Sequence, residues 1–579
     1  MASFIDSSTV HRNVLPNGLT VLVRRDRSAP VVAIVTHVKA GYFDESDDVS
    51  GIAHVLEHMF FKGTARRGVG DIAKETKASG GYLNAHTIYD ATAYFTVLPS
   101  SSFAAGLDIQ ADAYSSSAID AEELAKELEV IIQEAKRKAD NPPVLAVETL
   151  YELLHDKHRM RRWRIGHEAG LRALNRAAMM RFYRTFYRPS NTILSIVGDV
   201  DEREVMDHVG ELYGGLPDAP VERDHGPAEP DHDELRYREL EGDISQSQVV
   251  MGWRTPHTLH EDTPVLDVAS HILAAGRASR LYRALRERQL ASSVSAYNYS
   301  PTDLGVFVVH AETRPERAVD AARAAWDQLR TLRKEPIEAI ELERVRRIFE
   351  ARWMRRFESM EGQANYLAEW EALGGWQLGD EYFERFMSVT SEEVHEVVSR
   401  YLTPGRAAIV VYRPGSTPPA ANSAAELVAN LDASRVEALE PLPPHEPPIS
   451  PDEAETLPVE RTEGGVVVYR TASGLPILVR TKPGSAIVHI ALHAVGGVRD
   501  EPSERAGITT LAMRSSIKGT TTRTAAQIAE HSELLGGSVG TSVGAESFGW
   551  SISVPVQHLE AAVKLLADVV CNAVIPPDA

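Results

Sequence analysis

The chain repeats its own beginning near its end. Residues from Gly474 onward match residues from Gly18 onward at a constant offset of 456 positions (474 − 18), with no gap over about eighty residues. The matches are mostly turn glycines and short polar motifs: Gly18-Leu19 with Gly474-Leu475, Gly41 with Gly497, Asp44-Glu45 with Asp500-Glu501, Gly51-Ile52 with Gly507-Ile508, Lys62-Gly63-Thr64 with Lys518-Gly519-Thr520, and Gly80-Gly81 with Gly536-Gly537. An ungapped register of this length indicates a copied domain, because coincidence would explain only two or three matches. We expect that the chain ends inside this copy and is part of a longer, four-domain protein.

The region between the two copies predicts a further block of the same kind. Strands expected at 246–253, 292–299, 305–311 and 407–412 enclose helices in the order expected for the first block. Strands, then helices, then strands joined by hairpin turns indicate an α+β fold of repeated sandwich domains, mostly antiparallel sheets packed with helices. The sequence therefore predicts four segments: a first domain over 1–222, a second homologous domain over 236–415, a proline-rich linker over 416–460, and a partial third repeat over 461–579.

Composition limits the classes of partner. The 82 acidic and 61 basic residues give a net charge of −21, which argues against nucleic acid. The one basic cluster, residues 159–164, is interpreted as a solvated or substrate-facing loop. No apolar run approaches the roughly 20 residues needed to span a bilayer, so no membrane partner is expected. The single cysteine, Cys571, excludes an intrachain disulfide. Residues 1–10 show no apolar leader, so we expect a cytoplasmic location for the chain as given, and a periplasmic one if a signal peptide has been removed.

One predicted helix of the first block carries chemistry that its copy lacks. The stretch from Gly51 to Thr64 contains the pattern H-x-x-E-H, formed by His54, Glu57 and His58. Two histidines four positions apart share one helical face and can bind one metal ion, and Glu57 lies beside them as a base for a metal-bound water. This is the reverse order of the H-E-x-x-H zinc-peptidase helix. In the copy the three positions are Thr510, Met513 and Arg514.

A catalytic zinc usually has a third protein ligand. The predicted helix that begins at Asp120 offers five glutamates: Glu122, Glu123, Glu127, Glu129 and Glu134. On a helical wheel Glu127 and Glu134 lie together at the border of the apolar stripe, whereas Glu129 points away from it. The wheel does not choose between Glu127 and Glu134.

These motifs together resemble the pitrilysin (insulinase) family of zinc peptidases, of the inverzincin H-x-x-E-H type, which includes the mitochondrial processing peptidases. The segments that carry the resemblance are residues 51–64, 80–87, 90–94 and 127–134. The resemblance implies that Glu134, 76 positions beyond His58 (134 − 58), is the third ligand to one zinc ion per chain, and that Glu127 orients the site. It also implies that Asn84 and Ala85 begin an edge strand that binds the substrate backbone by β-addition.

The resemblance implies a zinc-dependent endopeptidase that hydrolyses short or unfolded peptides, with Glu57 as the general base. The partners that follow are a peptide substrate and either the C-terminal half of the same longer protein or a second subunit, which would close a chamber. The alternatives are a non-catalytic assembly or substrate-binding subunit of the same fold, and a zinc-stabilised binding module. Structural zinc sites are usually closed by four ligands, commonly with cysteine, which the first block lacks, so the enzyme is favoured.

Overall fold

The computed structural model describes residues 5–433, 439 and 457–575. The chain divides into two compact units, one formed by residues 1–346 with 359–440 and the other by residues 347–358 with 441–579. Each unit is described by itself. The predicted segment boundaries at 222 and 236 fall inside the first unit. Most of the second half of the predicted linker 416–460 lies outside the described residues.

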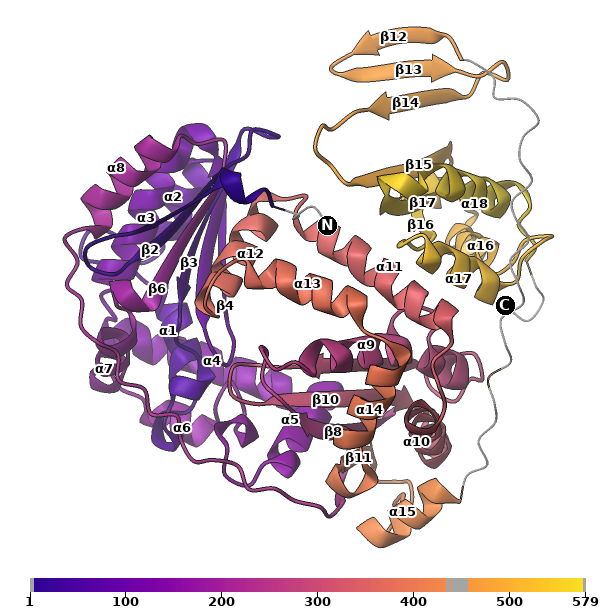
Figure 1. Cartoon of the computed structure of the whole chain (residues 1–579), viewed down its shortest axis with the longest axis horizontal. Helices are drawn as coiled ribbons and strands as arrows, with labels where there is room; N and C mark the ends of the chain where they lie inside the picture. Colours follow the sequence, from indigo (N-terminus) through magenta and orange to yellow (C-terminus); the bar gives the residue numbers. More distant parts are fainter. Residues whose placement is uncertain (1–4, 434–438, 440–456, 576–579) are drawn as a thin grey trace. The chain divides into compact units, whose positions relative to one another are not determined.

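The first sheet has six strands, in the order β1-β2-β6-β3-β5-β4 (Figure 1). Only β2 and β6 run parallel, and the other neighbours are antiparallel, as predicted for most of the sheet. The predicted hairpin turn is present, with Gly18 at a φ of +87° against Ser190. The strands are β1 (Val10–Val14), β2 (Thr20–Arg25), β3 (Val31–Val38), β4 (Tyr82–Thr87), β5 (Thr92–Pro99) and β6 (Thr192–Gly198).

Eight helices belong to the same part of the chain: α1 (Ile52–Phe60), α2 (Asp71–Ala78), α3 (Phe103–Ser116), α4 (Ala121–Ala139), α5 (Pro142–Leu154), α6 (Glu168–Ala173), α7 (Arg176–Phe186) and α8 (Glu202–Tyr213). α3 packs on β3 and β5, and α1 packs on β4, α4 and α7. A single apolar core joins these helices to the sheet, and Val55 and Leu56 of α1 lie inside it. The helix that bears the H-x-x-E-H pattern is therefore fixed by burial rather than by its own short length.

The second sheet has five strands, in the order β7-β11-β8-β10-β9. Its strands are β7 (Arg236–Gly242), β8 (Ser247–Thr255), β9 (Ser293–Tyr299), β10 (Gly305–Thr313) and β11 (Ala408–Pro414). The helices are α9 (Thr263–Ala274), α10 (Ala318–Lys334), α11 (Ala339–Arg356), α12 (Met360–Ala372), α13 (Leu378–Ser388), α14 (Ser391–Tyr401) and α15 (Ala424–Asp432). The two sheets of this unit exchange helices, since α12 packs on β3 and β6 while α5 packs on β8 and β11.

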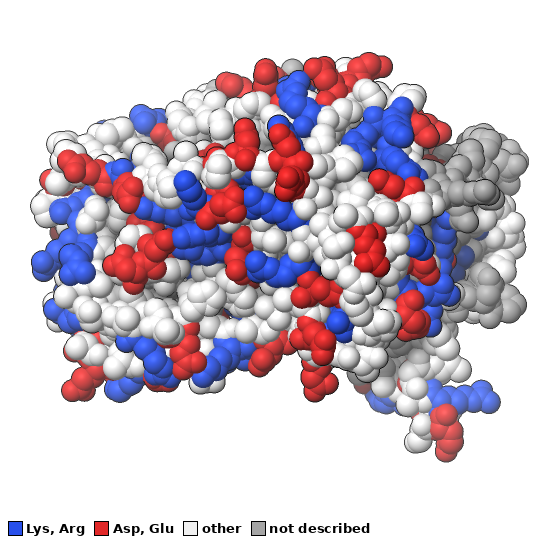
Figure 2. Space-filling model, turned by 90° about the horizontal axis from the view of Figure 1, so that it is seen from below, with Lys and Arg blue, Asp and Glu red and all other residues white. Residues whose placement is uncertain are grey.

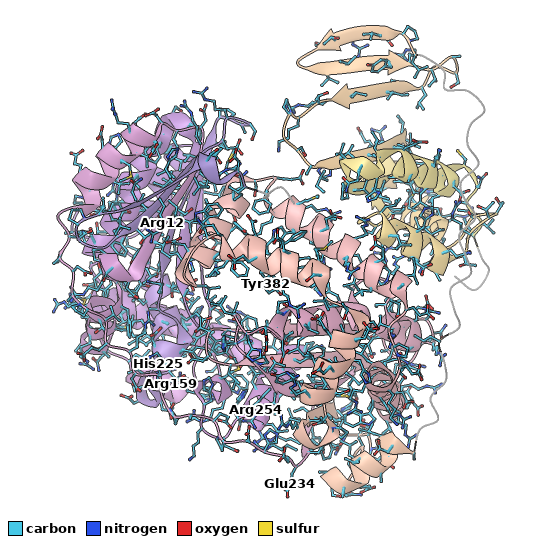
Figure 3. All side chains as sticks on the ribbon, in the orientation of Figure 1. Arg12, Arg159, His225, Glu234, Arg254 and Tyr382 are labelled. Carbon is cyan, nitrogen blue, oxygen red and sulfur yellow. The ribbon has the colours of Figure 1, made fainter. Side chains whose placement is uncertain are left out.

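The segment 217–235 joins the two sheets and is fastened at several points; we call it the strap. Glu229 accepts hydrogen bonds from three successive backbone amides, those of residues 156–158, at 2.7–2.9 Å. Arg254 of β8 reaches the same carboxylate at 3.3 Å, and Arg159 binds Asp224 (Figure 3). The strap is therefore held by ion pairs and by hydrogen bonds to backbone amides.

In its described residues the second unit contains two three-stranded sheets, three further helices and the C-terminal end of α11. β12 (Val459–Glu463), β13 (Val466–Arg470) and β14 (Pro476–Arg480) form one sheet, and β15 (Ile487–Val495), β16 (Gly540–Val543) and β17 (Ser547–Pro555) form the other. The helices are α16 (Ile508–Ser516), α17 (Ala525–Leu534) and α18 (Leu559–Cys571). α16, with Gly507 at its N-terminus, stands at the position that the repeat assigns to α1, with Gly51 at its N-terminus.

In the described part of the chain, no helix combines the length and the apolar character that crossing a bilayer would require. Acidic and basic side chains are interspersed over the face shown in Figure 2.

Candidate metal centre

The N-terminus of α1 is held by a buried carboxylate. Glu45, only 1% exposed, accepts hydrogen bonds from the backbone amides of Gly51 at 2.9 Å and Ala53 at 3.0 Å. Negative charge at a helix N-terminus is favourable. Gly51 has a φ of +94°, and a side chain there would meet the carbonyl oxygen of Ile165 at 2.6 Å. Burial raises the pKa of Glu45 to about 7, although Arg162 opposes this.

Three side chains from two helices converge beside α1. His54 and His58 project from consecutive turns, with ring centroids 4.7 Å apart. The Glu134 carboxylate of α4 approaches both, with Oε2 at 4.0 Å from His54 Nε2 and 3.8 Å from His58 Nε2. Among the described residues this is the one group of three or more histidine, cysteine or acidic side chains whose ligand atoms all lie within 4.8 Å of one another.

The donor set fits a zinc ion. Two neutral imidazoles and one carboxylate form a usual protein ligand set for catalytic zinc, which leaves a further position open. Ligand bonds of 2.0–2.2 Å in a tetrahedral site put neighbouring ligand atoms about 3.4 Å apart. The separations of 3.8 and 4.0 Å are a few tenths of an ångström wider, a difference that small side-chain rotations remove. Burial and the neighbouring His58 lower the pKa of His54 to about 4, which keeps this imidazole neutral.

Glu127 fixes the orientation of one imidazole. His58 Nδ1 donates a hydrogen bond to Glu127 Oε1 at 2.8 Å, which leaves Nε2 as the free lone pair on the side of Glu134. Lys62 Nζ forms an ion pair with the other carboxylate oxygen of Glu127, Oε2, at 2.6 Å. The hydrogen bond from His58, and next to it the contact with Lys62, lower the pKa of Glu127. By contrast, His54 Nδ1 is buried without a partner among the described residues, so packing alone holds that ring.

Glu57 lies on the same helix and is oriented by the last residue of β4. Thr87, the last residue of β4, donates its hydroxyl hydrogen to Glu57 Oε2 at 2.6 Å, and its Oγ1 also lies 3.3 Å from Thr92 Oγ1. Burial raises the pKa of Glu57 despite the hydrogen bond from Thr87. Since Oε2 is occupied by this bond, Oε1 remains available to accept a proton.

Asn84 and Ala85 lie on β4, the terminal strand of the first sheet. The Ala85 amide donates to its neighbour's Oδ1 at 2.9 Å, so this amide is not used in pairing with β5. An unpaired strand edge can accept an added strand.

A cavity of about 270 Å³ adjoins the cluster. Its walls include Thr87, which binds Glu57, and Lys138, which pairs with Glu134 at 2.9 Å. Aromatic and aliphatic side chains form most of the remaining wall: Tyr42, Ile88, Val144, Trp163, Ile165 and Tyr299. Glu148 lines it too and is held by Arg164 at 2.7 Å.

The interpretation of residues 159–164 as a solvated or substrate-facing loop is wrong for Arg159 and Arg162, and it stays a prediction for Arg164, which lines the cavity. Arg159 is 7% exposed and binds the carbonyl oxygen of Phe43. Arg162 donates to the carbonyl oxygens of Glu45 and Tyr42. These arginines fasten the loop that carries the Glu45 carboxylate, and only Arg164 faces the cavity. The carbonyl oxygens that they bind lie 116 to 120 positions away, so no local pattern could have identified these contacts.

Sequence reasoning also missed four residues of the site: Glu45, Lys62, Thr87 and Lys138. Two of them had a signal in the sequence, since Asp44-Glu45 and Lys62-Gly63-Thr64 are both copied in the repeat. Their copying indicates a role in the scaffold, which the structure assigns to the N-terminus of α1 for Glu45.

Comparison with known proteins identifies the family. The model of the insulinase family, peptidase family M16, matches residues 20–164 and 477–579, and that of the peptidase M16 inactive domain matches residues 173–349. An uncharacterized zinc protease of Rickettsia felis is 31% identical over 323 residues, covering 55% of this chain and 76% of the relative. One from Rickettsia bellii is 28% identical over 400 residues, covering 69% of this chain and 96% of the relative.

Solved structures of M16 peptidases and related proteases have a similar fold. A protease from Helicobacter pylori superimposes with a TM-score of 0.67 at 25% identity, covering 70% of this chain and 99% of that one. The periplasmic protease PqqL from Escherichia coli gives a TM-score of 0.64 at 17% identity, covering 100% of this chain and 67% of that one, a likeness of fold alone. The fold and the matches define an α+β peptidase of the insulinase type. The chain belongs to peptidase family M16, whose curated members similar to it are named zinc proteases.

Proposed function

We propose that this chain is a zinc-dependent endopeptidase that holds one zinc ion through His54, His58 and Glu134. The observation that carries the proposal is the approach of one carboxylate oxygen of Glu134 to the Nε2 atoms of both imidazoles, at 4.0 and 3.8 Å. Zinc bound there would supply Lewis-acid activation of a water molecule and polarise the substrate carbonyl. Membership of a family that contains zinc proteases supports the same assignment.

The residues around the metal would then have separate roles in the reaction. Glu57 takes the proton of the attacking water at Oε1, because Thr87 occupies Oε2, and later gives that proton to the leaving amine. The raised pKa of Glu57 suits a group that must both accept and release a proton near neutral pH. Glu127, backed by Lys62, keeps the Nε2 lone pair of His58 directed at the metal.

Substrate would bind as an added strand along β4, with its backbone at Asn84 and Ala85 and one side chain in the aromatic cavity. Only an extended backbone can pair with a strand edge, which favours short or unfolded peptides. We further propose that the C-terminal half of a longer protein, or a second subunit, encloses the substrate.

The decisive experiment compares the wild type with Glu57→Gln by zinc analysis and by cleavage of a quenched peptide. We expect zinc close to one ion per chain in both, with turnover in the wild type reduced at least about a thousandfold in the variant. Zinc in both without any turnover would refute cleavage by this chain alone, and would leave the non-catalytic, substrate-binding alternative or a need for the enclosing half or subunit. Absence of zinc from the wild type would refute the metal centre itself.

A further inference from the structure

A second cavity, larger than the one beside the metal centre, lies in the first unit. Its volume is about 400 Å³, within the range of small-molecule sites. The end of β3, the turn between β4 and β5, the strap, the loop after β9 and the end of α12 form its walls. His54, Glu57, His58 and Glu134 are not among the residues that line it. Ligand sites often lie where two domains meet, as the two sheets of this unit do here.

His37 lines this cavity from the end of β3, with its unpaired nitrogen buried behind the cavity wall. Its neighbour Thr36 binds Gln110 of α3 on one face of the sheet, so His37 faces the other side, where α12 packs. The imidazole is 3% exposed, and Nδ1 has no hydrogen-bond partner among the described residues. Buried polar groups are normally hydrogen-bonded, and an orphaned one needs an explanation. Burial lowers the pKa of His37 to about 4, so the ring is neutral and has one donor and one acceptor.

Lys39 brings a positive charge to the same wall, and the carboxylate of Glu371 opposes the lowering of its pKa. The residue is partly buried, and within the described residues its ammonium group has no ion pair or hydrogen bond. The neighbouring Arg223 is already engaged, since its guanidinium binds Asp44 and Asn191. Burial and the charge of Arg223 both lower the pKa of Lys39. An anionic group from a ligand would satisfy this ammonium.

Carboxylates line other parts of the cavity. Asp90, in the turn between β4 and β5, accepts hydrogen bonds from the backbone amide and hydroxyl of Thr302. Burial raises the pKa of Asp90 to about 6. Asp303 lies 3.9 Å from His158 Nε2, and Glu369 of α12 is also present. Apolar groups, among them Phe43 and Tyr299, complete the wall.

This combination narrows the chemistry of the ligand. A simple anion would pair with Lys39 but would be repelled by the carboxylates of Asp90, Asp303 and Glu369. An organic cation would be repelled by Lys39. A metal ion is disfavoured because the cavity contains no cluster of ligand atoms like the one formed by His54, His58 and Glu134. A molecule that carries a negative and a positive charge at opposite ends of an apolar part can pair with Lys39 and with the carboxylates at the same time. Its apolar part can contact the apolar side chains of the cavity.

We propose that this cavity binds a zwitterionic ligand of about dipeptide size, with its carboxylate on Lys39 and its ammonium toward Asp90 and Asp303. The apolar part of the ligand contacts Phe43 and Tyr299. Tyr299 also lines the cavity beside the metal centre, but Lys39, Asp90 and Asp303 line only the second cavity, so the proposal does not rest on the peptidase reaction.

The test is calorimetric titration of the dipeptide Ala-Phe into the full chain carrying Glu57→Gln, which prevents cleavage. We expect saturable binding, at least about tenfold weaker for N-acetyl-Ala-Phe and for Ala-Phe amide, since each lacks one charge. Lys39→Met should weaken binding of the free dipeptide by about tenfold or more, and Leu373→Trp, which narrows the cavity, should abolish it. The matched control Lys126→Met, at an exposed pair with Glu123, should leave binding unchanged.

Several outcomes would overturn the proposal. These are equal affinity for the free and capped dipeptides, retention of binding in both Lys39→Met and Leu373→Trp, or no saturable binding at millimolar concentration. Loss of binding in His54→Thr would place the ligand at the candidate metal centre instead. Thermal unfolding of each variant shows whether it is folded, and Leu373→Trp decides the question if Lys39→Met is not.

Discussion

The first block and its copy contain the same turn followed by a helix, but the two helices are buried to different extents. In both, a glutamate accepts from the first amides of the helix: Glu45 from Gly51 and Ala53, and Glu501 from Gly507 and Thr509. The surroundings differ. Val55 is fully buried, whereas its counterpart Leu511 is 63% exposed. The comparison teaches that local hydrogen bonding is copied with the sequence, whereas burial depends on what packs against it.

A second copied network strengthens this point. Thr64 and Arg67 both bind the carboxylate of Asp112 in the first block. Their counterparts at an offset of 456, Thr520 and Arg523, bind Asp568 in the same way. The metal-binding side chains are the part that was not copied. Scaffold and chemistry are therefore separable in this fold.

The largest expected effect comes from converting α1 toward its copy. His54→Thr introduces the residue present at Thr510 and should remove bound zinc and reduce peptide cleavage at least about a thousandfold. Zinc analysis and a quenched-peptide assay check this. The reverse change, Thr510→His with Met513→Glu and Arg514→His, should gain no zinc, because α16 would supply two imidazoles but not the third protein ligand that a catalytic zinc usually has. Zinc binding by that triple variant would contradict the comparison.

The second largest effect is expected at the glutamates that accept hydrogen bonds from the first amides of α1 and α16. Glu45→Ala should destabilise the first unit by about 2–4 kcal/mol, because two buried amides lose their acceptor. Glu501→Ala should have a much smaller effect, because water can replace an exposed carboxylate. Hydrogen exchange of the amides in α1 and α16 measures the two local stabilities separately. Equal losses in the two helices would show that burial does not set the value of the cap.

The apolar positions that follow give a smaller contrast. Val55→Ala should lower the free energy of unfolding of the first unit by about 2 kcal/mol, because it leaves a cavity in the core. Leu511→Ala should change the second unit by about 0.5 kcal/mol or less. Denaturant unfolding followed by exchange mass spectrometry tests both. A large loss for Leu511→Ala would mean that this side chain is buried in solution.

The smallest effect concerns the lysine copied between the blocks. Lys62→Met should weaken zinc affinity by about tenfold, since Glu127 would lose the partner that holds it against His58. Lys518→Met is the matched control and should leave zinc affinity unchanged. Competition with a fluorescent chelator measures both. Unchanged affinity in Lys62→Met would show that Glu127 needs no support from this lysine.

Much of the architecture was predictable because it follows local patterns. Strands β9 and β11 lie within two residues of the predicted segments 292–299 and 407–412, and Asp120 caps α4 through the amides of Glu122 and Glu123. The choice between Glu127 and Glu134 was different. Both lie on the same border of α4, yet one reaches His58 Nδ1 and the other faces the Nε2 atoms. The angle at which α4 crosses α1 separates them, and a helical wheel contains no information on that angle.

By itself, the sequence determined the repeated plan of the chain, the α+β class and the placement of two imidazoles on one helical face. These properties follow from spacing along the backbone, which periodicity and turn residues express directly. Tertiary structure alone decided that Arg159 and Arg162 bind backbone carbonyl oxygens inside the protein. It also decided that Thr87 orients Glu57. The same holds for the second cavity, which Lys39 and His37 border. Each of these depends on side chains brought together by packing over long sequence distances, where the net balance of burial and charge, rather than any local pattern, selects the partner.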